Sequence, residues 1–467
     1  MAELEPLYTA DEMRVAEARY PGYPETVPEL MERAGAAAAE VALRCFPAAR
    51  HWTVVCGGGS NGGDGRVMAR HLQAAGRDVR VVEAKAGDRE LGEPDVLVDA
   101  LFGTGFSGAP REDAAALIEA MNAAGAPIFS IDLPSGVDAS TGEVAGAAIG
   151  ATTTVTFHGR KLGLAVAPGR LRAGEVHVAD IGLQPLETAA RWVTEEILDL
   201  VPPKRPADNK YSAGSVLVVG GARGMTGAAA LAARAAFRAD AGYVAVAAPA
   251  GSLPVLETLV LEAVKRPLEQ VFEAAGRASA LAVGPGLGRG EEEAALVRRL
   301  LAEVAAPAVV DADALFGLEL GDWPGPRVLT PHEGELARLL GRSSAEVGAH
   351  RLASVREAAR RFRCVVLLKG ADTLVASPDG GVLVRVTDAP GLASAGTGDV
   401  LTGIVAAFLA KGMEPRLAAA AAATAHGLAA LLSGKRRGLV AGDVVEALPR
   451  ALAREAAPRE SPAPARG

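Results

Sequence analysis

Short β-branched segments alternate with alanine-rich segments of helical character along most of the chain, and this alternation restricts the fold more than any other feature. Such a pattern is typical of βαβ units, in which helices join parallel strands. The strands expected in the first half lie at residues 52–56, 78–83, 95–100, 127–131 and 152–157. Those expected in the second half lie at residues 215–220, 243–248, 280–284, 308–312, 328–330 and 364–369. The sequence therefore predicts an α/β protein built from parallel sheets.

The chain is too long for one hydrophobic core. A single core rarely organises more than about 300 residues, whereas this chain has 467, of which 49% are hydrophobic. A polar stretch at 184–209, with Pro202, Pro203 and Pro206, interrupts the alternation and indicates a connection between domains. We expect a first domain at 1–205 and a second at 206–467. The tail after about residue 452 has too little apolar area to bury, so we expect it to be frayed.

Charge, cysteine content and hydropathy exclude several classes of protein. A net charge of −8 argues against nucleic acid as a partner, because phosphate backbones require clustered Lys and Arg. Cys45, Cys56 and Cys364 are far apart and lack metal-ligand spacing, so neither disulfides nor a zinc site is expected. The N-terminus lacks an apolar signal region, and the most apolar stretch, 417–432, is too short to span a bilayer. We expect a cytoplasmic protein in which residues 417–432 form a buried helix.

A glycine-rich segment, GGGSNGGDG at residues 57–65, follows the first expected strand and precedes the helical run RVMARHLQAA. Glycines let backbone amides approach an anion, and a helix N-terminus adds a favourable dipole, so a pyrophosphate would bind well here. The segment is neither a Walker A loop nor a clean GxGxxG fingerprint. A tight strand-to-helix turn is the alternative interpretation, although six glycines in nine residues exceed what a turn needs.

Two further strand ends in the first half carry polar clusters, VDALFGTG at 98–105 and DLPSGVD at 132–138. In an open α/β sheet, ligands bind beyond the carboxyl ends of the strands, where all three clusters would converge. Asn61, Asp99 and Ser135 offer hard oxygen ligands for a cation, and Asp132 is a candidate acid or base. For any one of the aspartates a helix cap or turn remains an equal alternative.

These clusters, in this order and spacing, resemble the NAD(P)H-hydrate epimerase family over roughly residues 10–200. The resemblance implies a Rossmann-like three-layer fold and potassium bound by Asn61, Asp99 and Ser135. It also implies a binding site for the hydrated nucleotide formed by Ser60, Asn61, Gly62, Gly63, Asp64, Gly103, Thr104, Gly105, Phe106, Ser107, Gly108 and Asp132. Ser60 stands where the family commonly has Asn, a mild departure that keeps the potassium-binding Asn61.

The second half contains AGTGD at 395–399, directly before the helical run VLTGIVAAFLA. Glycines at a helix start form an anion hole, and Asp399 could take a proton from an attacking hydroxyl while the amides hold phosphate charge. Four other segments accompany it: GARGMTG at 221–227, GPGLG at 284–288, TPHEGE at 330–335 and KGADT at 369–373. Taken singly, AGTGD could be only a helix cap and His332 only a structural residue.

Together these segments resemble the ADP-dependent NAD(P)H-hydrate dehydratase family, a ribokinase-like fold, over about residues 205–450. The resemblance implies that Ala228, Gly286, His332 and Asp399 face the hydrated nucleotide. It implies an ADP site, with Mg²⁺ offsetting charge, formed by Lys369, Gly370, Ala371, Asp372, Thr373, Ser394, Ala395, Gly396, Thr397 and Gly398.

The two resemblances predict one function, the repair of NADH and NADPH that have added water across the nicotinamide ring. We expect Asp132 to assist reversible loss of the C6 hydroxyl, which interconverts the R and S hydrates. We expect Asp399 to deprotonate that hydroxyl in the S hydrate, which then attacks ADP, so that AMP and phosphate leave.

The alternatives are a vitamin or sugar kinase of the hydroxyethylthiazole type, since AGTGD also serves such kinases, and a first domain that only binds or scaffolds. We further expect a homo-oligomer, because alanine-rich helices could pack between subunits. No basic residue can be assigned to a 2′-phosphate, so a preference between NADH and NADPH hydrates stays open.

Overall fold

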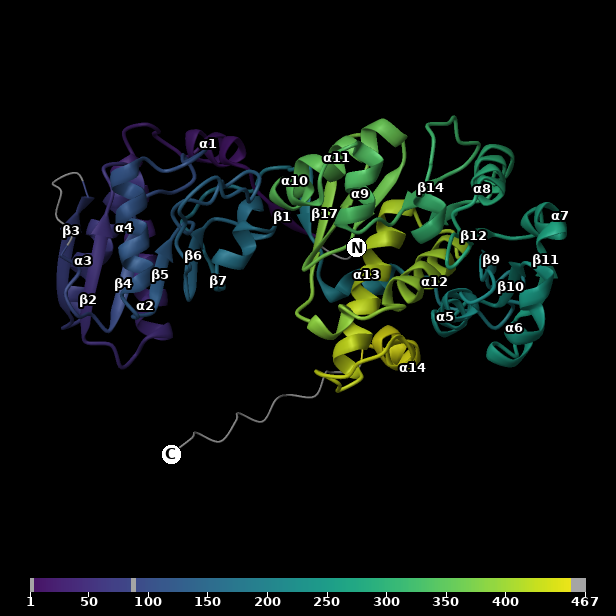
Figure 1. Ribbon diagram of the computed structural model, residues 1–467. Helices are drawn as coiled ribbons and strands as arrows, with labels where there is room; N and C mark the ends of the chain where they lie inside the picture. Colours follow the sequence, from purple (N-terminus) through teal and green to yellow (C-terminus); the bar gives the residue numbers. More distant parts are fainter. Residues whose placement is uncertain (1–3, 85–89, 455–467) are drawn as a thin grey trace. The chain divides into compact units, whose positions relative to one another are not determined.

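The computed structural model describes residues 4–84 and 90–454, and the chain forms two compact units (Figure 1). Pro6–Arg191 and Gly348–Ala353 make up the first unit. The described residues before Pro6, Trp192–Val347 and the described residues from Ser354 on make up the second. The division falls before the boundary that we expected near residue 205. Val193 donates its backbone N–H to the Val384 carbonyl (2.9 Å), and Ile197 is buried in the core of the second unit. The stretch at 184–209 is therefore not a free linker, because Val193 and Ile197 within it are bound to that core.

In the first unit the sheet has the strand order β3-β2-β4-β5-β6-β7, and every neighbouring pair is parallel. The expected strands are all present, and the edge strand β7 is an addition that the polar sequence EVHVA did not reveal. The strands are β2 (His51–Cys56), β3 (Asp78–Glu83), β4 (Val96–Ala100), β5 (Ile128–Ile131), β6 (Thr153–Phe157) and β7 (Glu175–Ala179).

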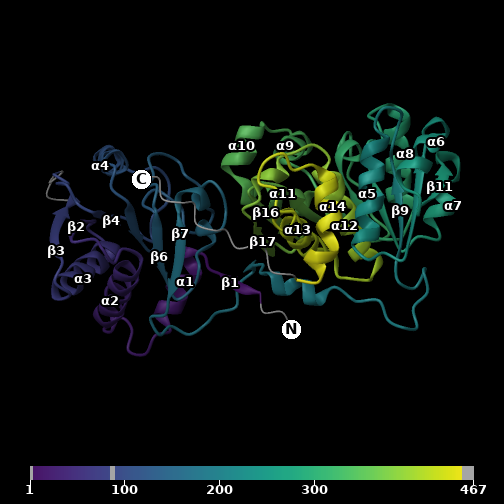
Figure 2. The same cartoon turned by 90° about the horizontal axis from the view of Figure 1, so that it is seen from below.

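Helices cover both faces of this sheet (Figure 2), which confirms the three-layer prediction. One buried cluster joins α2 and α3 to one face of the strands, and another joins α4 to the opposite face. The helices are α1 (Ala10–Ala18), α2 (Val27–Cys45), α3 (Ser60–Ala74) and α4 (Glu112–Ala123). The carboxyl ends of β2, β4 and β5 thus point to the same edge of the sheet, as the parallel pairing requires.

The second unit has a sheet that runs β17-β16-β15-β14-β13-β12-β9-β10-β11. Pairing is parallel from β11 to β15 and antiparallel for β16 and β17. The strands are β9 (Ser215–Val219), β10 (Tyr243–Ala248), β11 (Val264–Pro267), β12 (Ala280–Val283), β13 (Ala308–Val310), β14 (Arg327–Leu329), β15 (Val365–Leu368), β16 (Asp372–Ala376) and β17 (Val382–Val386). Two short strands, β1 (Glu5–Leu7) and β8 (Ala190–Trp192), contain the points where the chain passes between the units.

Helices α12, α13, α14 and α5 pack together beside this sheet (Figure 2). Gly403 of α12 lies so close to α5 that a Cβ there would come within 2.1 Å of the Ala232 carbonyl oxygen. The helices are α5 (Thr226–Arg238), α6 (Leu253–Leu259), α7 (Val271–Ala275), α8 (Glu291–Glu303), α9 (Glu333–Leu340), α10 (Ser344–Ala349), α11 (Arg351–Phe362), α12 (Thr397–Ala410), α13 (Pro415–Leu432) and α14 (Ala441–Leu452).

Helix α13 confirms the buried helix that we expected at 417–432. Burial lowers the pKa of its His426 to about 4, so this side chain is a neutral core residue. Within the described ranges, every helix is too short or too polar to cross a membrane. The alanines of α12 and α13 are buried inside the unit, so they are not available for the subunit contacts that we expected from them. Most of the tail that we expected to fray, residues 455–467, lies outside the described residues.

Candidate active sites

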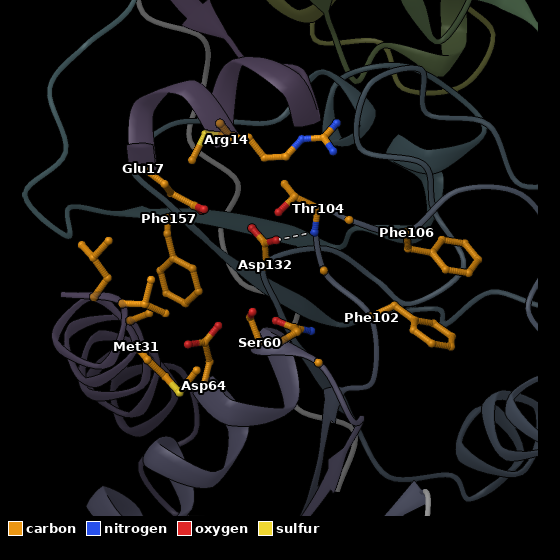
Figure 3. Close-up of a pocket in the computed structure, with 18 of the residues that line it drawn as sticks. Arg14, Glu17, Met31, Ser60, Asp64, Phe102, Thr104, Phe106, Asp132 and Phe157 are labelled. Atoms are coloured by element: carbon orange, nitrogen blue, oxygen red, sulfur yellow. Dashed lines mark hydrogen bonds between the residues drawn. The ribbon is translucent and has the colours of Figure 1, made fainter. Parts of the chain in front are cut away.

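A cavity of about 610 Å³ opens at the carboxyl ends of the strands in the first unit (Figure 3). Its walls come from α1, α2, the N-terminus of α3 and the loops after β4 and β5. The structure brings together most of the residues that we assigned to the hydrated nucleotide, namely Ser60, Asn61, Asp64, Gly103, Thr104, Gly105, Phe106 and Asp132. Gly62, Gly63, Ser107 and Gly108 are absent from the lining, as are Asp99 and Ser135.

The glycine-rich segment is mostly helix. Helix α3 begins at Ser60, whereas the sequence indicated a loop that extends to residue 65. A Cβ at Gly62 would come within 1.9 Å of the Gly57 carbonyl oxygen, and one at Gly65 within 2.6 Å of the Ala100 Cβ. These glycines therefore allow α3 to pack tightly on the turn and the sheet. The helix N-terminus that faces the cavity starts at Ser60, where free backbone amides suit an anion.

Asp132 stands at the end of β5 with a φ of +69°, in the left-handed region that is costly for a residue with a Cβ. Its Oδ2 accepts a hydrogen bond from the Thr104 N–H (2.8 Å), and its Oδ1 lies 2.8 Å from the Lys161 Nζ. Lys161 also donates to the Thr156 Oγ1 (2.9 Å) and the Phe157 carbonyl (2.8 Å). The strained backbone and these donors aim a charged carboxylate into the cavity.

Lys161 and Glu17 also line this cavity, and the sequence analysis missed both. Burial raises the pKa of Glu17, and the charge of Asp132 raises it further. Burial raises the pKa of Asp64 to about 8, with the charges of Asp132 and Glu17 adding to the effect and Lys161 opposing it. No motif marked Lys161, because it stands next to Arg160 in the mixed segment FHGRKLGLAV at 157–166, where a lysine gives no distinct signal.

Asp99 and Ser135 lie behind the cavity wall and form one buried cluster. The Ser135 Oγ donates to the Asp99 Oδ1 (2.6 Å), while the Ser135 N–H (2.8 Å) and Ser130 Oγ (2.9 Å) donate to Oδ2. Burial raises the pKa of Asp99, and these hydrogen bonds act against the rise. The Asn61 Nδ2 donates to the Ile131 carbonyl (3.2 Å), whereas its buried Oδ1 accepts no hydrogen bond from any described residue. An oxygen in that state can serve as a cation ligand.

In the second unit, α12 begins behind Gly396, which has a φ of +87°. Asp399 stands in the first turn, where burial raises its pKa to about 7 and the neighbouring charge of Asp311 contributes to the rise. A carboxyl group with this pKa can exchange a proton near neutral pH, as a general base must. The raised pKa of Asp399 thus supports the expectation from the sequence that this residue acts as a base.

Asp311, which follows β13, organises the charges around Asp399. Its Oδ1 lies 2.8 Å from the Lys369 Nζ, and its Oδ2 accepts a hydrogen bond from the Thr402 Oγ1 (2.6 Å). Burial would lower the pKa of Lys369, but the carboxylates of Asp311 and Glu335 outweigh that effect and raise it. A Cβ at Gly398 would lie 3.4 Å from the Lys369 Nζ, so the ammonium sits against the glycine turn.

Sequence analysis missed Asp311, Glu335 and Thr402. The rule that polar residues at the carboxyl ends of strands form sites would have found Asp311, because it ends the expected strand 308–312. Thr402 gave no such signal, since it lies one turn inside a helix that reads as apolar.

His332 caps the N-terminus of α9. Its Nδ1 accepts hydrogen bonds from the Gly334 N–H (3.0 Å) and the Glu335 N–H (3.3 Å), and the Glu335 carboxylate accepts one from the His332 N–H (2.9 Å). This helix cap is the structural role that the sequence analysis gave as the alternative for His332. The ring is also 59% exposed, and its Nε2 lies 3.5 Å from the Glu335 Oε1.

The other residues that the sequence analysis assigned to the hydrate and ADP sites of the second unit lie in three local groups. Gly286 lies beside Ala228, and Gly286 accepts a backbone hydrogen bond from Ala222 (2.7 Å), which joins the two glycine turns. The second group is the turn between β15 and β16, where Gly370 and Ala371 are exposed and Asp372 is buried in the sheet. The third group precedes α12, where the Ser394 and Thr397 hydroxyls donate to backbone carbonyls and hold the turn in shape.

Comparison with known proteins identifies the family. A family model described as NAD(P)H-hydrate dehydratase matches residues 216–450, and one described as YjeF-related protein N-terminus matches residues 27–90 and 83–163. The bifunctional NAD(P)H-hydrate repair enzyme Nnr of Moorella thermoacetica is 40% identical over 487 residues, which cover 91% of this chain and 92% of the relative. The chain belongs to the bifunctional NAD(P)H-hydrate repair enzymes.

Other bifunctional NAD(P)H-hydrate repair enzymes match over a similar extent. The enzyme of Escherichia coli is 37% identical, over 91% of this chain and 89% of its own length. Among solved structures, the ADP/ATP-dependent NAD(P)H-hydrate dehydratase of Bacillus subtilis, co-crystallised with ATP and Mg²⁺, superposes with a TM-score of 0.52 at 31% identity. That match covers 56% of this chain and 97% of the other, which confirms the ribokinase-like prediction for the second half of this repair enzyme.

Proposed function

We propose that this chain repairs hydrated NADH and NADPH in two steps, with one active site in each unit. The first unit interconverts the R and S hydrates, and the second converts the S hydrate back to NAD(P)H while ADP becomes AMP and phosphate. The observation that supports this proposal is that both halves of a repair enzyme stand in one chain and each carries a carboxyl group at its candidate site, Asp132 in the cavity and Asp399 at the start of α12.

In the first unit, the cavity binds the hydrated nicotinamide nucleotide. Its volume of about 610 Å³ is within the range of small-molecule sites. The N-terminus of α3 and the loop at Gly103–Gly108 would hold phosphate and ribose through their backbone amides. Asp132, which contacts Lys161 and the Thr104 N–H, is positioned to assist the reversible loss of the C6 hydroxyl, and it would accept a proton from the water that returns to C6.

A potassium ion would be held by Asn61, Asp99 and Ser135. The observation that supports this fit is the buried Asn61 Oδ1, which accepts no hydrogen bond within the described ranges, together with the wholly buried carboxylate of Asp99. Both are hard oxygen ligands. The ion would supply positive charge behind the cavity wall, where Phe102 also binds Ser135 through its backbone N–H (2.9 Å).

In the second unit, the nicotinamide hydrate would contact Ala228, Gly286 and His332, with its C6 hydroxyl directed to Asp399. Asp399 takes the proton, and the oxygen attacks the terminal phosphoryl group of ADP, which Lys369 and the amides at the start of α12 hold. The bond from this phosphorus to the AMP oxygen breaks and AMP leaves. The C6–O bond then breaks to release inorganic phosphate, a proton leaves C5 to water, and the C5=C6 bond reforms. Mg²⁺ would supply further charge neutralisation at the phosphates of ADP, and the Bacillus subtilis relative was crystallised with ATP and Mg²⁺.

The test of the second activity is product analysis. Incubation with the pure S hydrate, ADP and Mg²⁺ is expected to yield NAD(P)H, AMP and phosphate in equal amounts. Incubation with ATP and a thiazole alcohol is the control for a kinase, and we expect no phosphorylated alcohol. Hydrate consumption without AMP, or efficient alcohol phosphorylation, would reject the proposal.

We further propose that the enzyme works in the cytoplasm as a homo-oligomer. Free Cys45, Cys56 and Cys364 suit a reducing compartment. Light scattering of the purified chain tests the assembly, and a mass equal to one chain at micromolar concentration would reject it.

A further inference from the structure

Three carboxyl groups line the cavity of the first unit: Glu17 from α1, Asp64 from α3 and Asp132 from the end of β5 (Figure 3). The proposed function gives a chemical step only to Asp132. Figure 3 shows the Asp64 carboxyl pointing into the cavity from the side of α3, on a different element from Asp132. Two acids that approach one ligand from different elements can act on it from different directions.

The surroundings of the two aspartates differ. Asp132 forms an ion pair with the Lys161 ammonium (2.8 Å) and accepts a hydrogen bond from the Thr104 N–H (2.8 Å). The Asp64 carboxyl forms no hydrogen bond or ion pair with any residue that the structure describes. One aspartate is therefore supplied with donors, and the other is left without them.

Electrostatics separate the two groups further. Burial raises the pKa of Asp64 to about 8, and the charges of Asp132 and Glu17 contribute while Lys161 opposes. The charged and titratable groups that share the cavity with Asp64 are Arg14, Glu17, Tyr23, Asp132 and Lys161. At neutral pH Asp64 thus carries a proton that it can donate, beside a carboxylate that can accept one. Carboxyl pairs with divergent environments divide acid and base roles between them.

We propose that Asp64 is a catalytic residue of the epimerase site that works as the acid while Asp132 works as the base. This inference rests on the proposed function of the first unit. Asp64 protonates the C6 hydroxyl of the hydrate as that group leaves, and Asp132 takes a proton from the water molecule that adds at C6.

The step balances in atoms and electrons. The C6–O bond breaks, its electron pair leaves with the hydroxyl, and the Asp64 proton converts the hydroxyl to water. The nitrogen lone pair of the ring forms a C6=N1 double bond. Water then adds to the other face of C6, the double-bond pair returns to nitrogen, and the surplus proton moves to Asp132. The forward step leaves the proton on Asp132, and proton exchange with solvent water returns one to Asp64 and restores the starting state. The reverse epimerisation uses Asp132 as acid and Asp64 as base.

The experiment follows epimerisation of purified R hydrate without ADP, in water enriched in ¹⁸O, for the full-length wild type and the variants Asp64→Asn and Asp64→Glu. We expect wild type to incorporate one solvent oxygen per inversion. Asp64→Asn is expected to lose about 100-fold or more in kcat, the usual contribution of a general acid, with little change in KM. The wild-type rate is expected to fall above about pH 8, where Asp64 loses its proton, and Asp64→Glu is expected to keep such an alkaline limb.

Each outcome supports or rejects the inference. Inversion with retention of the original oxygen, or an Asp64→Asn variant with wild-type kcat, overturns it. Circular dichroism and thermal unfolding of Asp64→Asn report on folding of the first unit, and dehydration of the S hydrate with ADP reports on the second. If Asp64→Asn is unfolded, Asp64→Glu decides, and a missing alkaline limb in that variant overturns the inference. A wild type that does not epimerise at all would instead reject the proposed function.

Discussion

Lys161 lies 2.8 Å from Asp132, and its side chain is only 1% exposed, so the ion pair at the first cavity is almost completely shielded from water. A buried pair of this kind stabilises the fold little by itself, because desolvation offsets the attraction. Removing one partner leaves the other charge buried and unpaired. Lys161 therefore serves to keep Asp132 charged in a place where a lone carboxylate would be costly.

Replacement of Lys161 by Met is expected to lower the free energy of unfolding by about 3–5 kcal/mol, since Asp132 loses its cation. The rate of epimerisation by the Lys161→Met variant should also fall. The double variant Lys161→Met/Asp132→Asn removes both charges and is expected to regain much of the stability while remaining inactive as an epimerase. Denaturant unfolding measures the first effect, and equal stability of the single and double variants would contradict this account.

The dehydratase is expected to gain activity as pH rises through about 7, because Asp399 must lose its proton to act as a base and burial raises its pKa to about 7. Asp399→Asn cannot accept the proton, so its turnover should fall by about 100-fold or more at every pH. The pH dependence of kcat with S hydrate and ADP measures both. A flat wild-type profile between pH 5.5 and about 8.5 would count against Asp399 as the base.

Asp311→Asn removes a negative charge that helps to raise the pKa of Asp399, so the acid limb of the dehydratase profile should move to lower pH. The same variant frees the Lys369 ammonium from its 2.8 Å partner and should raise the KM for ADP. Thr402→Val is the matched control, because it deletes a hydrogen bond to the same carboxylate (2.6 Å) and leaves the charge. A larger shift in Thr402→Val than in Asp311→Asn would refute the electrostatic explanation.

Replacement of potassium by sodium is expected to reduce epimerisation and leave dehydration unchanged, since the candidate cation ligands Asn61, Asp99 and Ser135 all belong to the first unit. Asn61→Leu removes the buried oxygen that accepts no hydrogen bond and should abolish the response to potassium. Asn61→Asp, which keeps an oxygen ligand, should retain part of it. The measurement is the rate of epimerisation in potassium and in sodium at fixed ionic strength. A rate that does not depend on potassium would falsify the assignment of these ligands.

The sequence predicted the strands β2 to β6, β9, β10 and β12 to β15, because buried parallel strands appear as short β-branched runs such as Trp52–Cys56. It missed β11 and the antiparallel pair β16 and β17, and so it wrongly predicted a wholly parallel sheet in the second unit. It could not reveal β7, an edge strand whose polar residues lack such a run. The start of α3 at Ser60 was also hidden, because glycines that usually indicate loops here let a helix pack against Gly57 and Ala100. The sequence around a glycine does not show whether that glycine forms a loop or lets a helix pack closely.

The predicted site residues came from strand ends and glycine turns, and the structure gathers most of those assigned to the first cavity. The partners that set their charge did not come from such segments. Lys161 and Asp132 are far apart in sequence and meet only through the sheet, and the same holds for Asp311 and Lys369. Ion pairs of this kind depend on tertiary packing, so no short motif could indicate them.

The most direct test of two linked activities supplies the chain with an equal mixture of R and S hydrates, excess ADP, Mg²⁺ and potassium, and follows the absorbance of reduced nicotinamide. The account predicts complete recovery of NAD(P)H, with a second phase that disappears in the Asp132→Asn variant. Recovery that stops at half in the wild type, or a second phase that persists in Asp132→Asn, would contradict it.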